Sequence, residues 1–524
     1  LDVSINFPVE QALEAHQINF VASGNVANLN IPNLPLGINL SSGDMNIAIN
    51  QTGIYILGEC ELNTQPFKVA WQQNFSSSFE FQNQYTLSGT LESSQVKKFL
   101  KADNLLTEEN ILRGKLGVEV RGNVKSDGKK QFVAHVNFRD AYISIPDIGW
   151  VKPRKTPAKL HLTATGHEKA NFQTMGFDFL GKNISFSGHS ILKNGYLEKI
   201  RFDQIIFGET KVLAEAIVLD QGWRVNIEGP NLDLTTLIDR YKNSERKFVR
   251  GPRFDITIAV ERAKIFKDKF LRNLSGYFKN DGLVWSNVSF TSTLNQVDSL
   301  EVKLKPKEGK RYLEIRSNDA GAVLSTFGLY DNVKGGALEL KAIFEDMTPD
   351  SKIKGNGSIR SFRLVDAPIL ARLLGLASIT VIPDELAGAG LSFQRFDVPF
   401  NIHRGLIEFK DAKAGGNSLG ITGAGILDID ADTLQAQGTI APLDKINSLL
   451  GNLPLLGVFF SAGEKGGGIF AAEYQIMGPL EDPKITTNPL TVLAPGIFRK
   501  FFEMFPISNN TKGNLEWPDR DDPN

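Results

Sequence analysis

The sequence of 524 residues has a single cysteine, Cys60. One cysteine excludes an internal disulfide framework and a zinc site built from several thiolates. The charges nearly cancel, with 58 basic against 59 acidic side chains, so the overall charge gives no reason to expect nucleic acid as a partner. The six histidines are spread along the chain without the short spacings of metal ligands: His16, His135, His161, His167, His189 and His403.

Long apolar runs are also absent. The best candidate for a membrane span, residues 446–463, is interrupted by Asn452 and Pro454, so we expect it to be buried or to enter an interface rather than to span. The chain begins at Leu1 without an initiator methionine, a basic segment or an apolar targeting segment. We therefore expect a fragment or a processed product.

Patterns that match catalytic motifs lack the context that the chemistry requires. Residues 416–420 fit the GxSxG pattern, but that nucleophile needs a following helix and a later histidine, and no histidine follows His403. We expect a glycine-rich hairpin turn there. Asp428, Asp430 and Asp432 alternate, which predicts a solvated strand face rather than a calcium site. The sequence therefore predicts a non-enzymatic protein without a cofactor or a metal.

Glycine and phenylalanine are abundant, with 48 Gly and 35 Phe against 9 Tyr and 5 Trp. The length exceeds the roughly 250–300 residues at which single cores stop growing, so we expect several units or an elongated repetitive body. Period-two alternation of apolar and polar residues dominates and predicts strands with one apolar face. It is clearest at residues 132–138, 254–258, 300–305, 338–341 and 427–432.

Short apolar helices recur in one setting. Each is followed by a linker, a glycine and a new series of strands, which suggests one unit used five times. The five helices are expected at residues 96–100, 234–241, 323–327, 369–374 and 446–450. The predicted fold is mainly β: an elongated, twisted antiparallel sheet that forms an open apolar groove, with several short helices. A row of separate β-sandwiches with small helices at their ends is the alternative.

A last helix is predicted after Pro495 and Gly496, and it is amphipathic. It either caps the β core or lies against a membrane or a partner. After residue 506 the chain is polar, and residues 507–524 are predicted to be a disordered tail. The apolar face of the helix consists of Ile497, Phe498, Phe501, Phe502 and Phe505.

Several motifs resemble those of one known family. They are residues 371–376, 396–409, 423–430, 437–440, 474–484, 488–496 and, upstream, 145–152. Through them the C-terminal third resembles the AsmA-like proteins, and most closely the large YhdP type, which is related to TamB and AsmA. The similarity is good over residues 361–505 and diffuse over residues 1–360. It gives three expected segments: a repetitive β-groove region at 1–360, an AsmA-like C-terminal region at 361–506, and the tail at 507–524.

The resemblance implies a bridge-like carrier that moves phospholipid between the inner and outer membranes of a diderm bacterium. It implies a periplasmic protein, anchored in the inner membrane through a segment absent from this chain. The physics agrees, because acyl chains lying on an apolar sheet face avoid about 0.8 kcal/mol for each exposed CH₂ group. Phospholipid acyl chains, the membrane surface and other cell-envelope proteins are the expected partners.

A periplasmic β-rich scaffold, or an assembly factor for outer-membrane biogenesis, is the alternative function. It would use the same strands around closed cores. The carrier hypothesis instead places every second residue of a strand along the groove. The residues expected to line it are Phe254, Ile256, Ile258, Leu338, Leu340 and Phe344.

Overall fold

The fold is described from a computed structural model, in which the chain divides into two compact units. Unit 1 comprises residues 1–317, 322–329 and 346–349, and unit 2 comprises residues 318–321, 330–345 and 350–524. The described residues are 1–488, without 11–13, 15–16, 35–37, 77, 101–111, 168–169, 195, 244–249, 296, 377–389 and 443–471. They contain 29 strands and few short helices, which confirms the predicted mainly β class.

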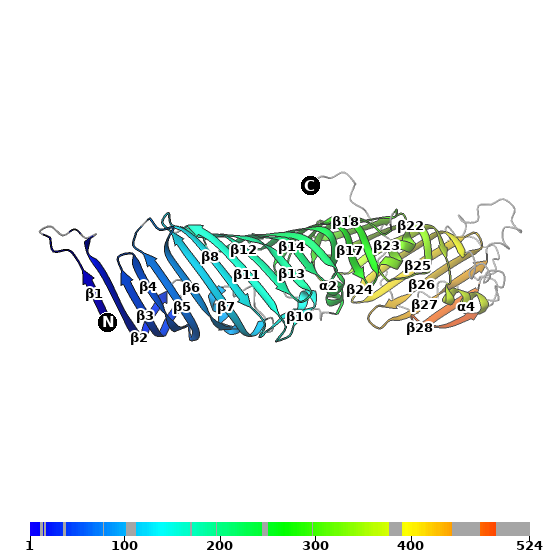
Figure 1. Ribbon diagram of the computed structural model, residues 1–524. Coiled ribbons are helices and arrows are strands. Elements are labelled where there is room, and N and C mark those ends of the chain that lie inside the picture. Colours follow the sequence, from blue (N-terminus) through cyan, green and yellow to red (C-terminus); the bar gives the residue numbers. More distant parts are fainter. Residues whose placement is uncertain are drawn as a thin grey trace. The chain divides into compact units, whose positions relative to one another are not determined.

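Unit 1 holds strands β1 to β21 (Figure 1). Their bounds are β1 Asp2–Asn6, β2 Asn19–Leu34, β3 Ile38–Asn50, β4 Gly53–Leu62, β5 Gln65–Asn74, β6 Phe81–Glu92, β7 Leu112–Lys125, β8 Lys129–Asn137, β9 Ala141–Ile145, β10 Trp150–Lys152, β11 Ala158–His167, β12 Ala170–Gly181, β13 Ile184–Lys193, β14 Tyr196–Phe207, β15 Thr210–Leu219, β16 Gly222–Asp233, β17 Arg253–Phe266, β18 Lys269–Asn280, β19 Trp285–Thr293, β20 Ser299–Lys307 and β21 Lys310–Ser317.

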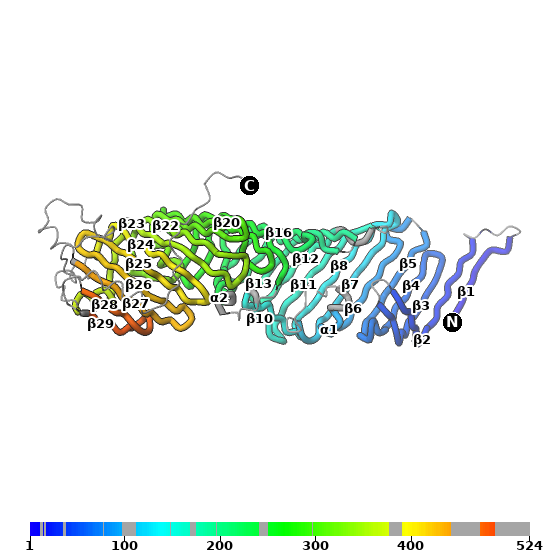
Figure 2. Tube along the Cα trace, turned by 180° about the vertical axis from the view of Figure 1, so that it is seen from behind, coloured from blue at the N-terminus to red at the C-terminus, as the bar shows by residue number. Residues whose placement is uncertain are grey.

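Successive strands of unit 1 pair with their neighbours, and Figure 2 shows the same order from behind. β8 pairs with β11, because β9 and β10 leave the main sheet and form a small second sheet with the start of β7. β16 and β17 are parallel, which departs from the predicted antiparallel pattern. A parallel pair needs a crossover connection, and helix α2 (Thr235–Asn243) lies in the segment between these two strands.

Four of the five predicted short helices are confirmed, and the fifth, at 446–450, lies outside the described residues. They are α1 (Ser93–Leu100), α2, α3 (Ala320–Thr326) and α4 (Pro368–Leu376). α1, the β9–β10 hairpin and α2 all leave the main sheet at one edge, since β6, β8 and β16 run in the same direction. We call this the covered edge of unit 1.

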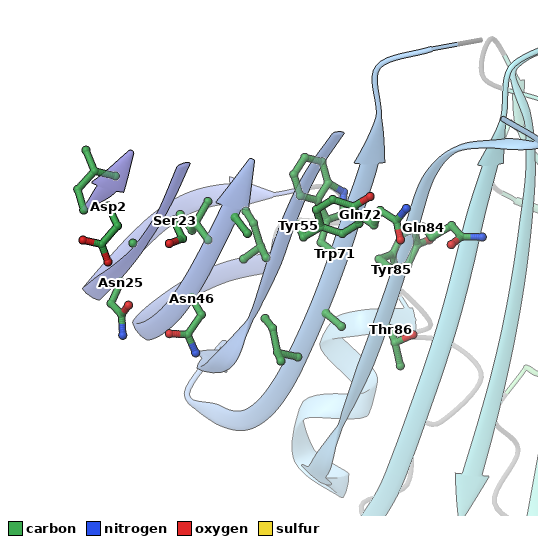
Figure 3. A pocket seen from close by; sticks show the side chains of 17 residues that line it. Asp2, Ser23, Asn25, Asn46, Tyr55, Trp71, Gln72, Gln84, Tyr85 and Thr86 are labelled. Atoms are coloured by element: carbon green, nitrogen blue, oxygen red, sulfur yellow. The ribbon is translucent and has the colours of Figure 1, made fainter. Parts of the chain in front are cut away.

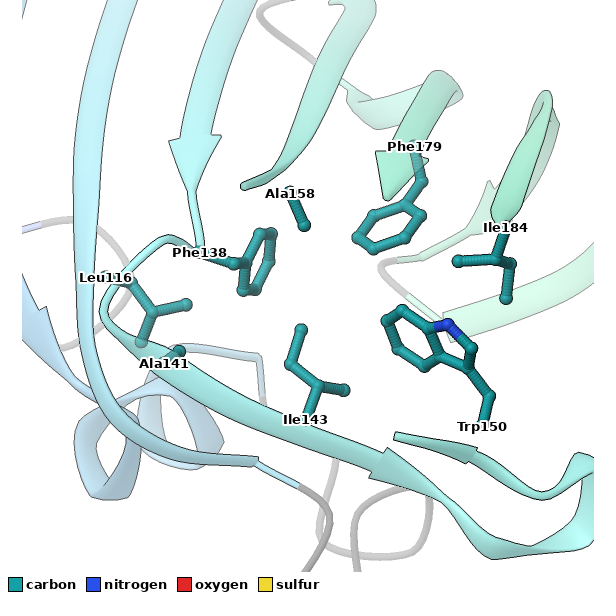
Figure 4. Close-up of a cluster of buried hydrophobic side chains, with 8 residues drawn as sticks. All are labelled: Leu116, Phe138, Ala141, Ile143, Trp150, Ala158, Phe179 and Ile184. Atoms are coloured by element: carbon teal, nitrogen blue, oxygen red, sulfur yellow. The ribbon is translucent and has the colours of Figure 1, made fainter. Parts of the chain in front are cut away.

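A hydrophobic cluster lies at the covered edge (Figure 4). Phe179 and Ile184 of the main sheet pack there with Ile143 and Trp150 of the β9–β10 hairpin. The Trp150 ring meets the Phe179 ring edge-on at 6.1 Å between centroids, and its indole N–H donates to the Lys182 carbonyl oxygen at 3.1 Å. The hairpin, with the 3₁₀ turn η3 (Pro146–Ile148) at its tip, therefore forms a second layer over this part of the sheet.

Unit 2 contains the remaining strands, which pair as antiparallel neighbours from β22 to β29. Helix α4 buries Leu370, Leu373 and Leu374. The strands are β22 Val333–Phe344, β23 Ile353–Leu364, β24 Leu391–His403, β25 Leu406–Gly416, β26 Leu419–Asp428, β27 Thr433–Pro442, β28 Ala472–Pro479 and β29 Lys484–Asn488.

Two local expectations for unit 2 have different outcomes. Residues 417 and 418 connect β25 to β26, so the GxSxG match is the predicted hairpin turn. The expected strand face of Asp428, Asp430 and Asp432 is wrong, because β26 ends at Asp428. The Asp428 carboxylate accepts the backbone N–H of Asp430 at 3.0 Å, which fixes a turn instead. Among the described residues, no helix has the length and apolar character that a bilayer crossing requires.

Candidate functional site

Two rows of residues, apolar except for Ser190, cross the main sheet of unit 1 from β2 to β21, passing directly from β8 to β11. The Ser190 hydroxyl donates to the Met175 carbonyl oxygen at 3.4 Å. Each residue of a row is register-paired with the next one on the neighbouring strand. Row one consists of Gly24, Ile47, Ile56, Trp71, Tyr85, Gly122, Phe132, Ala164, Met175, Ser190, Ile200, Ala216, Val225, Ile256, Phe278, Val288, Leu304 and Leu313.

Row two lies two residues along each strand and contains no polar side chain. Because side chains of one strand alternate between faces, both rows lie on the same side of the sheet, which we call the apolar face. Row two consists of Val26, Met45, Gly58, Val69, Leu87, Val120, Ala134, Leu162, Phe177, Gly188, Phe202, Ala214, Ile227, Ile258, Gly276, Phe290, Val302 and Ile315.

The residues between the two rows point to the other side of the sheet, and most of them are polar. Ion pairs hold this polar face together, for example Lys279 with Asp255 at 3.6 Å and Lys199 with Glu215 at 2.7 Å. From β6 to β21 the intervening residues are Thr86, Arg121, Val133, Thr163, Gly176, His189, Arg201, Glu215, Asn226, Thr257, Tyr277, Ser289, Lys303 and Glu314.

Burial on the apolar face varies with distance from the covered edge. Leu116, Ala158 and Ile184 at that edge are only 2%, 1% and 5% exposed. Most large side chains of row one, such as Ile56 and Ile256, are half-buried. The apolar face is therefore closed along one edge and retains accessible apolar surface in its middle.

Aromatic rings lie across some strands of this face rather than projecting from it. The Tyr85 ring occupies the space that a side chain at Gly122 would fill. Phe278 stacks with Phe290 on the next strand, with ring centroids 5.7 Å apart and planes 20° apart. Glycines in the rows thus give room to neighbouring rings, and the rows remain continuous where a strand contributes no side chain.

An open pocket of about 570 Å³ lies at the start of row one (Figure 3). Gly24, Ile47, Ile56, Trp71 and Tyr85, the first five residues of that row, line it together with polar residues such as Asn46, Gln72 and Gln84. Burial raises the pKa of Tyr85, which keeps its phenol neutral well beyond pH 7.

Unit 2 has rows of the same kind on its own sheet. Polar residues such as Lys354, Asn401, Glu408 and Gln435 lie between them on the other face. One row consists of Ala342, Gly355, Phe400, Phe409, Gly425, Ala436, Ile476 and Ile485, and the next consists of Phe344, Ile353, Ile402, Ile407, Leu427, Leu434 and Gly478.

The six residues expected to line the groove fall on these faces. Ile256 belongs to row one and Ile258 to row two, and Phe254 lies two residues before Ile256 on the same strand. Leu338, Leu340 and Phe344 share a parity on β22 in unit 2. A role of these side chains in contacting lipid stays a prediction. The expected interfacial residues Ile497, Phe498, Phe501, Phe502 and Phe505 lie outside the described residues.

Sequence reasoning missed the pocket residues Trp71 and Tyr85. Alternation on the pocket strands is obscured, because Leu57 adds an exposed apolar side chain to the polar face of β4. Gly122 removes an apolar side chain from the other face. Only the register of the paired strands reveals that these positions continue one row.

The polar groups of the described residues suggest no catalytic constellation. No group of three or more His, Cys, Asp or Glu among them is placed to hold a metal ion. Cys60 is 5% exposed, and burial raises the pKa of its thiol, which disfavours the reactive thiolate. The main sheet instead offers an apolar face and, on its opposite side, a charged face.

Comparison with known proteins agrees with the C-terminal motifs. No curated protein sequence matches the chain. A family model does match it, over residues 273–485, which extend from within β18 to within β29 and so begin upstream of the region where the motif similarity was strongest. The model is described as the YhdP protein, and this match confirms the predicted resemblance to the YhdP type over these residues.

Proposed function

We propose that the protein is a non-enzymatic carrier of phospholipid, whose acyl chains lie along the apolar face. The observation that carries this proposal is the unbroken register of rows one and two from β2 to β21. Paired strands are about 4.8 Å apart, so consecutive row residues leave no polar gap between them. Acyl chains can move from one strand to the next without meeting an unpaired polar group.

The energetics favour an apolar ligand on this surface. Half-buried side chains such as Trp71, Ile256 and Phe278 lose their remaining contact with water when an acyl chain covers them. Covering apolar surface contributes about 25 cal/mol per Å², and no single residue is required for the effect. This suits a carrier, in which the ligand must slide rather than remain fixed at one position.

We infer the orientation of the lipid from the covered edge. Helix α1 and the β9–β10 hairpin occupy that edge, so the acyl chains point toward it. The head groups then lie at the opposite edge, where short turns such as residues 126–128 and 220–221 connect the strands. Water remains available to the head groups there.

The match of residues 273–485 to the YhdP family model is consistent with a lipid-transport protein of the bacterial envelope. We place the chain in the periplasm of a diderm bacterium, between the inner and outer membranes, anchored in the inner membrane through a segment outside these 524 residues. A scaffold or assembly factor for outer-membrane biogenesis is the competing function. In its tandem-sandwich form it needs a second sheet over the first, and among the described strands of unit 1 only β9 and β10 supply one, together with the start of β7.

Site-specific photo-crosslinking tests the carrier function. A benzophenone side chain is placed at Ile256 and Val225 of row one and, as matched controls, at the adjacent Thr257 and Asn226 of the polar face. Irradiation in cells should give phospholipid adducts at Ile256 and Val225 and none at the controls. Polypeptide adducts at the row positions would favour the assembly factor, and equal lipid labelling of both faces would contradict the carrier.

The membrane surface is a further proposed partner, through Ile497, Phe498, Phe501, Phe502 and Phe505. Deletion of residues 495–524 tests this. Reduced association with liposomes at unchanged thermal stability supports membrane contact. Reduced thermal stability with unchanged liposome association would mean that the segment only caps the β body.

A further inference from the structure

Two histidines face each other on the polar face of unit 1. His135 on β8 and His161 on β11 are register partners, although the chain between them runs through β9 and β10. Their Nδ1 atoms are 3.1 Å apart, and their ring centroids are 4.5 Å apart with planes tilted by 38°. His135 is exposed, so the pair is open to solvent.

The spacing of these two nitrogens suits chelation. Zinc binds imidazole nitrogen at about 2.0–2.1 Å, so two nitrogens on one ion lie about 2.9 Å apart at a right angle and about 3.4 Å apart at the tetrahedral angle. The 3.1 Å separation lies between these limits. An ion can therefore replace the hydrogen bond between the rings with little movement of either strand.

On the polar face, a carboxylate lies on each side of the histidine pair. Glu119 on β7 is the register partner of His135, and Asp178 on β12 is the register partner of His161. Arg121 holds the Glu119 carboxylate at 2.7 Å, whereas the Asp178 side chain is exposed. The negative charge of Asp178 favours a cation at the histidine pair, whereas Arg121 compensates the charge of Glu119.

We propose that His135 and His161 bind one divalent transition-metal ion, such as Zn²⁺, with water completing the coordination. The ion clamps β8 to β11 at the base of the 20-residue excursion formed by residues 138–157, which carries the β9–β10 hairpin. Closing this junction stabilises the sheet where its strand order is interrupted. The site lies on the face opposite the rows and is independent of the proposed lipid function.

Titration of the purified chain with Zn²⁺, with Mg²⁺ as the hard-cation control, tests the site by calorimetry and by thermal unfolding. We expect one Zn²⁺ per chain and a raised unfolding midpoint. His135→Gln or His161→Gln should weaken Zn²⁺ binding at least tenfold and remove the shift of the unfolding midpoint. His189→Gln should leave both unchanged, because His189 is a partly exposed histidine whose Nδ1 lies 3.5 Å from Asp203 Oδ2, away from the pair. All three positions are on the polar face, so the variants should fold normally.

The paramagnetic spectrum of bound Cu²⁺ gives a second readout. It should show two nitrogen ligands in the native chain and fewer in the double variant that combines His135→Gln with His161→Gln. Zn²⁺ binding that is equally tight in the double variant would overturn the proposal. So would the absence of stoichiometric Zn²⁺ binding by the native chain.

Discussion

Gly276 on β18 faces Phe290 on β19 so closely that a Cβ atom at Gly276 would overlap both the Cβ atom and the backbone of Phe290. The two residues are neighbours in row two. The rings of Phe278 and Phe290 stack on the same two strands, with their centroids 5.7 Å apart. The backbones of β18 and β19 thus leave no room for a side chain at Gly276.

Gly276→Ala should destabilise unit 1 by about 1–3 kcal/mol, because the clash is with backbone that cannot rotate away. Urea unfolding measures the change. Gly117→Ala is the matched control, since the nearest atom to its added Cβ is 3.6 Å away. An equal free energy of unfolding for the two variants would contradict the close packing.

Ile256→Asp should block lipid occupancy of the apolar face. An uncompensated carboxylate in an apolar environment costs several kcal/mol, and its charge interrupts row one. Thr257→Asp is one residue away on the polar face and should leave lipid binding unchanged. The measurement is native mass spectrometry of co-purified phospholipid together with transfer between liposomes. Equal occupancy and transfer in both folded variants would argue against the rows as the lipid path.

A charge on the apolar face can be compared with a charge on the polar face in unit 2 as well. Leu340→Asp should reduce transfer, because Leu340 shares its parity with Leu338 and Phe344 on β22. Lys341→Asp changes the adjacent residue, on the other side of the strand, and serves as the control. Transfer that is lost only with Ile256→Asp would restrict the lipid path to unit 1.

Trp150→Ala should detach the β9–β10 hairpin from the covered edge. Trp150 is 5% exposed, and replacing a buried tryptophan by alanine costs about 3–5 kcal/mol. It also leaves the Lys182 carbonyl oxygen without its indole donor. Val151→Ala, at a side chain 49% exposed, should have little effect. Hydrogen exchange at Phe179 and Ile184 should rise in the Trp150 variant and not in the control.

Stability of unit 2 should fall at alkaline pH through Tyr474. Burial raises the pKa of this phenol from 10.0 to about 12, since its ionised form is disfavoured in the folded state. Stability contributed by the raised pKa is complete below pH 10 and is lost as the pH rises through about 12. The loss is about 2–3 kcal/mol.

Tyr474→Phe separates the hydrogen bond that the hydroxyl makes from the effect of ionising the buried phenol. At neutral pH it should lower the free energy of unfolding by about 1 kcal/mol, because the hydroxyl donates to the Thr422 carbonyl oxygen at 2.8 Å. Above pH 10 the variant should lose less stability than the native chain. Urea unfolding across this pH range, followed by tyrosinate absorbance, measures both effects. Parallel curves for the two proteins would contradict the buried phenol.

The amino-acid sequence by itself determined the class of fold and the faces of single strands. Strict alternation around Ile256 and Leu338 is a local property, because consecutive side chains of a strand always point to opposite sides. The short helices were also predictable, since their apolar spacing and the glycines after them are local signals. The motifs near Tyr474 indicated the resemblance to the YhdP type.

Only the tertiary structure decided which strand residues adjoin one another. Register depends on long-range pairing, so the sequence does not reveal that Ile56, Trp71 and Tyr85 follow one another in row one. Nor does it reveal the parallel pair β16–β17. The meeting of His135 and His161 arises because β9 and β10 leave the sheet and bring β8 against β11. Local alternation fixes the direction of a side chain, but its neighbours come from hydrogen bonds between strands distant in the chain.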